Sequence, residues 1–412
     1  MIVDAWSGGK YLLPAFQSIG YPVLHVQSGD VPDVFRHDRA NAVNRAEWFI
    51  EAGDDFSELI DHISRFEVAA VLAGSEGGVF LADRIANSLG VGFANDFATA
   101  SARRNKFDMQ ERLREVGIGC ISQELISDEY ALAAWLDSVT SFPVVLKPVE
   151  SAGTQGVHVC HTREQCCDAF TSILSIPDFF GSTNTAVLCQ EFLDGDEYVI
   201  NGVAADGRYV VTEGWKSDKT DNHGSRVYDT QYLFWHGDPH FQDIVAYVED
   251  VCRALGLVNG PFHAEVMLTD RGPILIEIGA RIAGGADPYV IEECLGRSQI
   301  AALVDAVARP SVFESRRGLP PVSAHRRAAY VYFVGRTHGR VQPNRFIDQV
   351  ASVPGVVHVS YRYDIGDEQP LTRDLVTSPG VALVIAADEA ALASAVNRIR
   401  SVESDFQRDC IR

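Results

Sequence analysis

The most regular alternation of apolar and polar positions lies in residues 262–285, which read FHAEVMLTDRGPILIEIGARIAGG. Every second residue of 262–268 is apolar, and 274–278 is a run rich in isoleucine, so both segments are predicted to be strands. The letters TDRGP between them have the composition of a turn. If the strands pair as an antiparallel hairpin, Glu265 and Glu277 lie close together on one face.

These two glutamates suggest a site for a cation and for phosphate. Carboxylates held so close repel each other unless a cation lies between them, and Mg²⁺ is commonly bound by carboxylates together with substrate phosphates. Arg281 lies four residues after Glu277 in the sequence. Gly284 and Gly285 then leave the backbone open to a ligand. The alternative interpretation is a solvated outer strand face, where most charged strand residues are found.

Residues 1–98 alternate short apolar segments with helical patterns. Strands are predicted at 2–3, 23–26 and 68–73, and helices at 11–19, 55–65 and 74–87. This alternation favours a doubly wound parallel sheet, which is an α/β architecture. Ligands bind beyond the carboxyl ends of such strands, so residues 7–9 and 74–76 are expected to face one crevice. The letters SGGK near the N-terminus lack the spacing of a phosphate-binding P-loop.

Two lysines and a glycine-rich turn follow. A helix with a basic start is predicted at 95–116 and includes Lys106, and a strand at 142–148 carries Lys147 near its end. The letters SAGTQGV at 151–157 are typical of a flexible turn. A strand-end lysine supplies charge to a polyphosphate, and the amides of a glycine-rich turn can bind its oxygens. Glycine is common in turns of any function, so the turn alone does not decide between these interpretations.

An acidic hairpin is predicted at 186–199. Its connector can bond an adenine edge through the backbone, and Glu197 can accept hydrogen bonds from ribose hydroxyls. The simpler interpretation is an acidic turn in solvent.

Residues 215–234 are polar and are predicted to form a long surface loop, of the kind that often covers a substrate. His223, Arg226 and Tyr228 are possible substrate contacts in this loop.

The remainder of the chain is predicted to be helical and then α+β. Helices are expected at 243–255, 287–295 and 298–308, a linker at 310–323, strands at 328–334, 356–363 and 381–386, and a last helix at 388–401. The predicted domains are therefore 1–98, 99–310 and 322–412.

Composition limits the class of protein. The 412 residues allow two or three domains. A net charge of −21, from 35 Lys+Arg and 56 Asp+Glu, argues against binding to nucleic acid or to an anionic membrane. The eight cysteines contain no CxxC pair and are interpreted as reduced thiols. No signal peptide and no membrane-spanning apolar run is visible, so a cytoplasmic protein is predicted.

Six short motifs, in this order, resemble those of the ATP-grasp carboxylate–amine ligases, most closely the L-amino-acid ligase (dipeptide synthetase) branch. They are NKF around Lys106, VLKP ending at 148, SAGTQGV at 151–157, QEFLDGDEYV at 190–199, FHAEV at 262–266 and IEIGARIAGG at 276–285. The resemblance implies an ATP-grasp fold of α/β and α+β elements. It places a doubly wound pre-ATP-grasp domain before the ATP-grasp domain and an α+β domain after it.

The resemblance also implies a role for each motif. The residues expected to bind ATP are Lys106 and Lys147 at the phosphates, Ser151, Gly153, Thr154 and Gly156 in a covering loop, Gln190, Glu191 and Leu193 at the adenine hinge, and Glu197 at the ribose. The residues expected to hold Mg²⁺, for which Mn²⁺ is a possible substitute, are Glu265 and Glu277. The residues that it implies at the substrate are Arg281, Gly284 and Gly285. His263 and Arg226 are further candidate substrate contacts from their places in the sequence, although His263 could equally be a packed strand histidine. Arg281 and Lys147 would stabilise the transferring phosphoryl group.

One position departs from the common family pattern. Many ATP-grasp enzymes have Asn two residues after the second metal-binding Glu, in the order E-I-N-P-R, whereas this chain has Gly279 within EIGAR. A direct third protein ligand is therefore lost, and the number of Mg²⁺ ions stays open.

The implied activity is a two-step ligation, in which ATP phosphorylates a substrate carboxylate and the amine of an amino acid then displaces phosphate. The partners would be small-molecule acid and amino-acid substrates, with a homodimer as a further possibility. Three alternatives remain, namely an ATP-grasp carboxylase, a ligase for a larger pathway-specific acid in peptide natural-product biosynthesis, and a nucleotide-binding protein without turnover. The motifs identify neither substrate.

Overall fold

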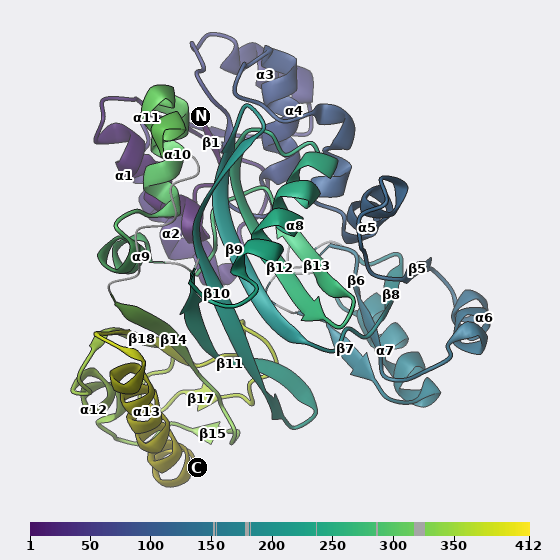
Figure 1. Cartoon of the computed structure of the whole chain (residues 1–412), viewed down its shortest axis with the longest axis vertical. Coiled ribbons are helices and arrows are strands. Elements are labelled where there is room, and N and C mark those ends of the chain that lie inside the picture. The colour runs from purple at the N-terminus through teal and green to yellow at the C-terminus, as the bar shows by residue number, and fades with distance from the viewer. Residues whose placement is uncertain are drawn as a thin grey trace.

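The computed structural model describes residues 1–150, 153, 155–177, 181, 183–235, 237–285, 287–316 and 326–412 (Figure 1). Three larger sheets and one two-stranded ribbon make up this part of the chain.

The N-terminal sheet is parallel, with the strand order β3-β2-β1-β4. Its strands are β1 (Ile2–Val3), β2 (Leu24–Gln27), β3 (Trp48–Glu51) and β4 (Leu72–Ala73), and its helices are α1 (Leu12–Gln17), α2 (Arg36–Arg45), α3 (Phe56–Ile63) and α4 (Val79–Leu89). Ile2 packs in one core cluster with α1, while Val3 packs in another with α3 and α4. Successive strand residues point to opposite faces. Helices therefore cover both faces, and the predicted doubly wound α/β sheet is confirmed.

A second, antiparallel sheet has the order β5-β8-β6-β7. Its elements are β5 (Gln123–Ile126), β6 (Val144–Pro148), β7 (His158–Cys160) and β8 (Val187–Glu191), with α6 (Glu129–Ser138) and α7 (Arg163–Ser175) packed on it. This unit lies beside the large central sheet (Figure 1). Val144 and Leu146 enter the core under the helices. Lys147 therefore points to the opposite face of β6.

The largest sheet has eight strands in the order β13-β12-β9-β10-β11-β14-β18-β16. They are β9 (Asp196–Ala205), β10 (Arg208–Asn222), β11 (Ser225–Phe234), β12 (Gly260–Thr269), β13 (Gly272–Gly279), β14 (Arg327–Phe333), β16 (Val356–Tyr361) and β18 (Gly380–Ala386). Strand β14 pairs directly with β11, through residues such as Thr230 and Val331. The C-terminal strands thus continue the central sheet, and the boundary expected between 310 and 322 stays a prediction.

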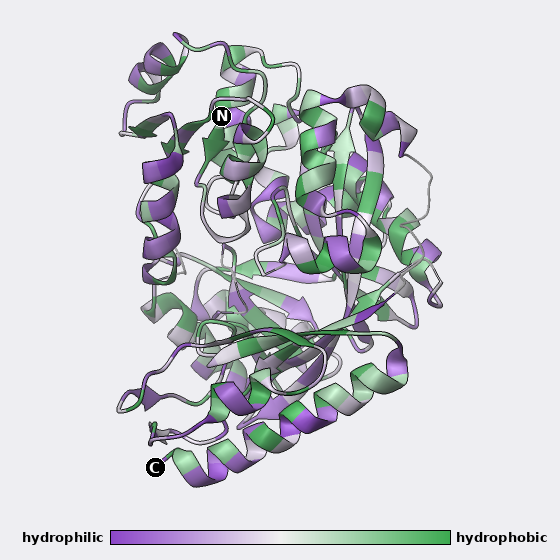
Figure 2. Cartoon of the chain, turned by 90° about the vertical axis from the view of Figure 1, so that its left-hand side faces the viewer, coloured by the Kyte–Doolittle hydropathy of each residue, from purple (hydrophilic) through white to green (hydrophobic). Residues whose placement is uncertain are grey.

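The remaining elements are α5 (Lys106–Glu115), α8 (Phe241–Ala254), α9 (Pro288–Leu295), α10 (Gln299–Ala308), α11 (Pro310–Ser315), α12 (Phe346–Ala351), α13 (Glu389–Cys410), β15 (Gly339–Arg340) and β17 (Glu368–Gln369). Buried residues of α13 recur every three or four positions, as at Leu392, Val396 and Ile399, so one side of the helix packs on the C-terminal strands. Figure 2 shows hydrophobic and hydrophilic residues mixed along this helix. None of the helices in the described ranges combines the length and the apolar character that crossing a membrane requires.

The prediction of a surface loop at 215–234 is wrong. These residues belong to the long strands β10 and β11, which pair with each other from Gly214 and Phe234 to the turn at His223, with one register shift between Asp218 and Lys219. Several polar side chains of this hairpin are buried and contact other polar groups of the protein, and they do not face solvent. Lys219 has an exposed side-chain fraction of only 13%, because it forms an ion pair with Glu197. A pattern rule that equates polar with exposed misses such strands.

Two other segments also differ from the prediction. Residues 95–116 are not one helix, because Asn105 is extended and its side chain accepts bonds from the amides of Phe107 and Asp108, which begins α5 at Lys106. The linker expected at 310–323 starts with α11, whose Phe313 is buried. Residues 317–323 of that linker lie outside the described residues.

Arg103 joins the N-terminal sheet to the rest of the chain. Its side chain is fully buried, and it forms an ion pair with Asp83 of α4 at 2.8 Å. It also donates to the carbonyl of Leu255 at the end of α8 at 2.7 Å and to the carbonyl of Asp96 at 2.9 Å. A residue that the sequence grouped with a basic helix start is therefore a structural link between two units.

We expect Arg103→Ala to destabilise the fold, because it leaves the Asp83 carboxylate buried without its partner. Breaking a buried ion pair in this way typically costs about 3–5 kcal/mol. Urea unfolding followed by circular dichroism would measure the change, with Arg65→Ala at an exposed position as the control. A change for Arg103→Ala as small as that of the control would contradict this role.

Candidate active site

A large cavity lies where the three sheets meet. Its volume is about 1410 Å³, and its lining comes from all parts of the fold, for example Glu76, Lys147, Glu277 and Arg373. Pockets for a single small ligand usually measure about 300–1,000 Å³, so this cavity has room for more than one ligand. Ser7, Ser75 and Glu76 all line it. The shared crevice expected after the first and last strands of the N-terminal sheet is therefore present.

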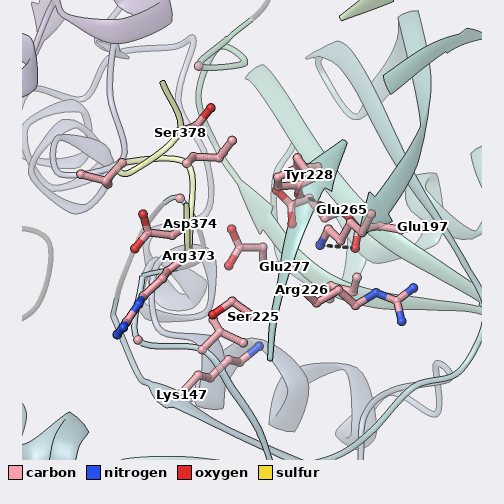
Figure 3. A pocket seen from close by; sticks show the side chains of 18 of the residues that line it. Lys147, Glu197, Ser225, Arg226, Tyr228, Glu265, Glu277, Arg373, Asp374 and Ser378 are labelled. Carbon is pink, nitrogen blue, oxygen red and sulfur yellow. Dashed lines mark hydrogen bonds and ion pairs between the residues drawn. The ribbon is translucent and has the colours of Figure 1, made fainter. Parts of the chain in front are cut away.

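The two predicted carboxylates face each other across one hairpin. Glu265 of β12 and Glu277 of β13 are direct partners in the antiparallel register, and a register shift follows immediately after Glu265. Their side chains are 19% and 25% exposed, and both point into the cavity (Figure 3). The hairpin prediction is confirmed, and the pair is not a solvated outer face.

Two buried lysines approach Glu277 from different elements. Lys106, the first residue of α5, lies with its Nζ 3.0 Å from Glu277 Oε2. Lys147 on β6 is 5% exposed. Burial, together with repulsion from Lys106, lowers the pKa of Lys147 to about 8.

The ionisation of Glu277 follows from these neighbours. Burial alone would raise the pKa of its carboxyl group, but Lys106, Lys147 and Arg281 outweigh that effect and hold this pKa well below its ordinary value. The carboxylate is therefore charged at neutral pH, which is the form that binds a cation. Among the described residues, no group of three or more His, Cys, Asp or Glu side chains gathers as a metal site. Two carboxylates completed by substrate phosphates still fit Mg²⁺.

Arg281 is held by the N-terminal unit. Its Nε donates to Glu76 Oε2 at 2.7 Å, and its Nη1 donates to the carbonyl of Ile282 at 3.0 Å. The loop after β1 packs on the next residues: the hydroxyl of Ser7 donates to the carbonyl of Gly284 at 3.3 Å. A Cβ on Gly8 would lie 2.2 Å from the carbonyl oxygen of Ala283, so only glycine allows this approach.

The expected adenine hinge combines an apolar patch with a bonded polar edge. Leu193 packs with Ile121 and Ile274 in a small cluster. Gln190 donates from Nε2 to Gln123 Oε1 at 3.0 Å. Glu191 accepts from the amide of Ser122 at 2.9 Å and from Arg271 Nη2 at 2.8 Å. All three predicted hinge residues line the cavity, and their contact with adenine stays a prediction.

Glu197 is more deeply engaged than expected. It is 5% exposed, and its two oxygens accept from Lys219 Nζ at 2.6 Å and from the hydroxyl of Tyr228 at 3.0 Å. Each carboxylate oxygen has a second lone pair, so Glu197 can still accept a hydrogen bond from a ribose hydroxyl. The hydrogen bond from the buried Tyr228 holds the Glu197 side chain in place.

The remaining predicted substrate contacts, His263, Arg226 and His223, lie at separate places along the cavity wall. His263 lies between Asn201 and Glu265, with its Nδ1 2.7 Å from Asn201 Oδ1 and its Nε2 3.5 Å from Glu265 Oε1. The guanidinium of Arg226 extends away from Glu277 in Figure 3. His223 bonds to the carbonyl of Arg336 in the C-terminal part of the chain.

The glycine-rich turn is described only in part. Gly153 and Gly156 have φ values of +66° and +71°, which favour glycine. The carbonyl of Gly153 accepts from the amide of Leu375 at 3.3 Å, so the turn touches a loop after β17. Ser151 and Thr154, two predicted phosphate-loop residues, lie outside the described residues.

Sequence reasoning missed four contributors to this cavity. Glu76 was expected near the crevice but had no assigned role, and Lys219 was placed in a surface loop. Arg373 and Asp374, which Figure 3 shows in the same pocket, were not singled out at all. The aromatic and β-branched residues at 209–212 could have indicated a strand, but nothing in the sequence indicates the ion-pair partner of Lys219.

Comparison with known proteins identifies the family. The ATP-grasp domain family matches residues 140–288. Dapdiamide A synthase of Enterobacter agglomerans is 48% identical over 407 residues, covering 98% of this chain and 96% of that protein. The chain belongs to the ATP-grasp carboxylate–amine ligases.

More distant relatives of this ATP-grasp ligase agree with the assignment. The L-arginine-specific L-amino acid ligase of Bacillus subtilis is 23% identical over 203 residues, which covers 48% of each chain. The crystal structure of an L-amino acid ligase from Bacillus licheniformis has a TM-score of 0.72 at 19% identity, covering 98% of this chain and 96% of that one. A carboxyaminoimidazole ribonucleotide synthase from Aspergillus clavatus, solved with ATP, has a TM-score of 0.70 at 15% identity, over 98% of each chain. The ATP-grasp fold extends over the whole chain.

We expect nucleotide binding to this ATP-grasp ligase to take up protons near pH 8. The lowered pKa of Lys147, about 8, means that its amine is increasingly neutral above that pH. A bound polyphosphate favours the ammonium form and raises this pKa, so ADP affinity should fall as the pH rises from about 7 to 9.5.

Calorimetry of ADP binding in buffers of different ionisation enthalpy would measure the proton uptake. Lys147→Arg keeps the charge at every pH tested and serves as the matched control, which should remove the pH dependence. An unchanged pH dependence in this variant would show that another group takes up the proton.

Proposed function

We propose that this ligase activates the carboxylate of an amino-acid-like acid as an acyl phosphate and joins it to the amine of an amino acid. The observation that carries the proposal is the gathering of Lys106, Lys147 and Arg281 around the Glu265–Glu277 pair at one cavity. Cationic groups and paired carboxylates suit phosphoryl transfer, which needs positioning and charge neutralisation more than covalent chemistry.

In the first step, a carboxylate oxygen of the acid attacks the γ-phosphorus of ATP. A carbon–oxygen–phosphorus linkage forms, the bond from the γ-phosphorus to the bridging oxygen breaks, and ADP leaves. Lys106 and Lys147 would neutralise charge on the phosphates, and Arg281 would bind the carboxylate and then the transferring phosphoryl group. Glu265 and Glu277 would hold Mg²⁺ or Mn²⁺, which supplies further positive charge when bound.

In the second step, the amine nitrogen attacks the acyl carbon. The carbon–nitrogen bond forms, the bond from that carbon to the phosphate oxygen breaks, and inorganic phosphate leaves while the nitrogen loses a proton. Backbone amides at Gly284 and Gly285, together with Arg281, would orient the acyl phosphate. Water must be kept from this intermediate, and the loops around Gly153 and Leu375 meet at the cavity where such a cover is needed.

The nucleotide would lie along the second sheet. Leu193 and the backbone near Gln190 and Glu191 would contact adenine, and Glu197 would accept from ribose. Gly153 and Gly156 would cover the phosphates, together with Ser151 and Thr154. A homodimer and a cytoplasmic location stay predictions.

A larger, pathway-specific acid is the second candidate substrate. The identity of 48% to dapdiamide A synthase spans nearly the whole chain, whereas the identity to the arginine-specific amino acid ligase is 23% over half of it. The cavity of about 1410 Å³ also leaves space for an acid larger than a single amino acid.

We expect MgATP to release phosphate only when both an acid and an amine are present. A panel of amino acids and of N-acylated amino acids, offered singly and in pairs, would be followed by phosphate release and mass spectrometry. A product mass equal to the two substrates minus water names both of them. If N-acylated amino acids serve as the acid and free amino acids do not, the second candidate is established. Nucleotide binding without turnover on any pair would contradict the ligase proposal.

We expect Glu277→Gln and Arg281→Ala each to lower the rate by at least about 10²–10³, because each removes charge that the transition state requires. Steady-state kinetics with the substrate pair found above would measure the loss. Glu124→Gln, at an exposed position on β5, is the matched control and should keep its rate. Turnover near the wild-type rate in either site variant would refute the site assignment.

A further inference from the structure

Gly279 and Glu76 share one small space beside Arg281. A Cβ built on Gly279 would lie 2.8 Å from Glu76 Oε2, 3.2 Å from Arg281 Cγ and 3.3 Å from Arg281 Nε. The first of these distances is shorter than any normal contact of a Cβ atom. A Cβ at 279 would therefore force the Glu76 carboxylate to shift from its present place, 2.7 Å from Arg281.

The contact joins two units that are far apart in the sequence. Glu76 follows β4 of the N-terminal sheet, whereas Arg281 follows β13 of the central sheet. Both side chains are largely buried, at 15% and 14% exposure, so the pair is not a solvent-exposed contact of little consequence.

The bonds of Arg281 determine which of its donors face the ligand. The Nε–H donates to Glu76, and one Nη1–H donates to the carbonyl of Ile282. A guanidinium has five N–H donors, so one on Nη1 and both on Nη2 have no partner among the described residues. The Nη1–Nη2 edge carries one N–H from each nitrogen, and such an edge can bind two oxygens of a carboxylate or phosphate side by side.

We propose that Glu76 is a positioning residue for Arg281, which fixes the guanidinium so that its Nη1–Nη2 edge faces the acid substrate, and that Gly279 leaves the space in which the Glu76 carboxylate makes this contact. The proposal rests on the substrate-binding role of Arg281 proposed above. The N-terminal unit thereby completes the site and does not merely flank it.

Three variants test the pairing by kinetics. Glu76→Ala removes the acceptor, Glu76→Gln keeps an oxygen that can accept from Nε–H, and Gly279→Ala displaces the carboxylate. Misplacing a reacting group by about 1 Å can cost about 10²-fold in rate, so Glu76→Ala and Gly279→Ala should each lower kcat by about that factor. The Kd for ADP should not change, because ADP lacks the phosphoryl group that Arg281 would contact, and Glu76→Gln should recover most of the rate.

A double-mutant cycle separates positioning from a general structural effect. Once Glu76 is alanine, the carboxylate that a Cβ at 279 would displace is gone and only the longer contacts with Arg281, at 3.2 and 3.3 Å, remain, so Glu76→Ala/Gly279→Ala should be little slower than Glu76→Ala alone. Additive losses in the double variant would overturn the proposal. Gly92→Ala, where an added Cβ meets nothing within 4 Å, and Glu67→Ala at an exposed position are the matched controls.

The outcomes distinguish this inference from the proposed function. Loss of activity in Arg281→Ala with a normal rate in Glu76→Ala would overturn the positioning role and leave the ligase site standing. A normal rate in Arg281→Ala would refute the site itself. If Glu76→Ala does not fold, Gly279→Ala still decides, because it displaces the carboxylate without opening a cavity: a normal kcat in this variant would overturn the proposal.

Discussion

The way in which the three sheets meet depends on the balance of charge among the side chains around Glu277. Glu277 is paired with Lys106 from α5, faces Lys147 from the second sheet and lies near Arg281, which is in turn paired with Glu76 from the N-terminal sheet. A single buried charge without partners costs several kcal/mol, so none of these groups would be stable there alone. Because the partners come from different units, the electrostatics of the site and the packing of the units stabilise each other.

This balance also prepares the site for its ligands. Three cationic side chains, Lys106, Lys147 and Arg281, stand against the carboxylates of Glu265, Glu277 and Glu76 in a chain whose net charge is −21. A polyphosphate adds negative charge and a divalent cation adds positive charge, so the two can enter together without leaving an unpaired charge. Positive charge that is scarce in the chain as a whole is concentrated at the cavity where we propose that phosphoryl transfer takes place.

The sequence predicted those parts of the fold and site in which the signal is local. The hairpin of Glu265 and Glu277 followed from strand alternation and turn composition, and the doubly wound sheet followed from alternating strands and helices. The β10–β11 hairpin was missed because its buried face is polar, and α5 was started too early because the break at Asn105 depends on one cap. Gly279 appeared only as a missing ligand, since the neighbour that needs its space is far away in the sequence.

By itself, the sequence determined the family, the order of the motifs and the residue types that an ATP-dependent ligase needs. The tertiary structure alone decided which charges meet: that Lys106 pairs with Glu277, that Lys219 supports Glu197, that Arg103 is structural, and that Glu76 holds Arg281. The physical reason is that the residue type fixes the chemistry of a side chain, whereas the packing of the folded chain decides which other side chain it meets. Only packing removes water from an ion pair, and packing brings together residues that no local pattern connects.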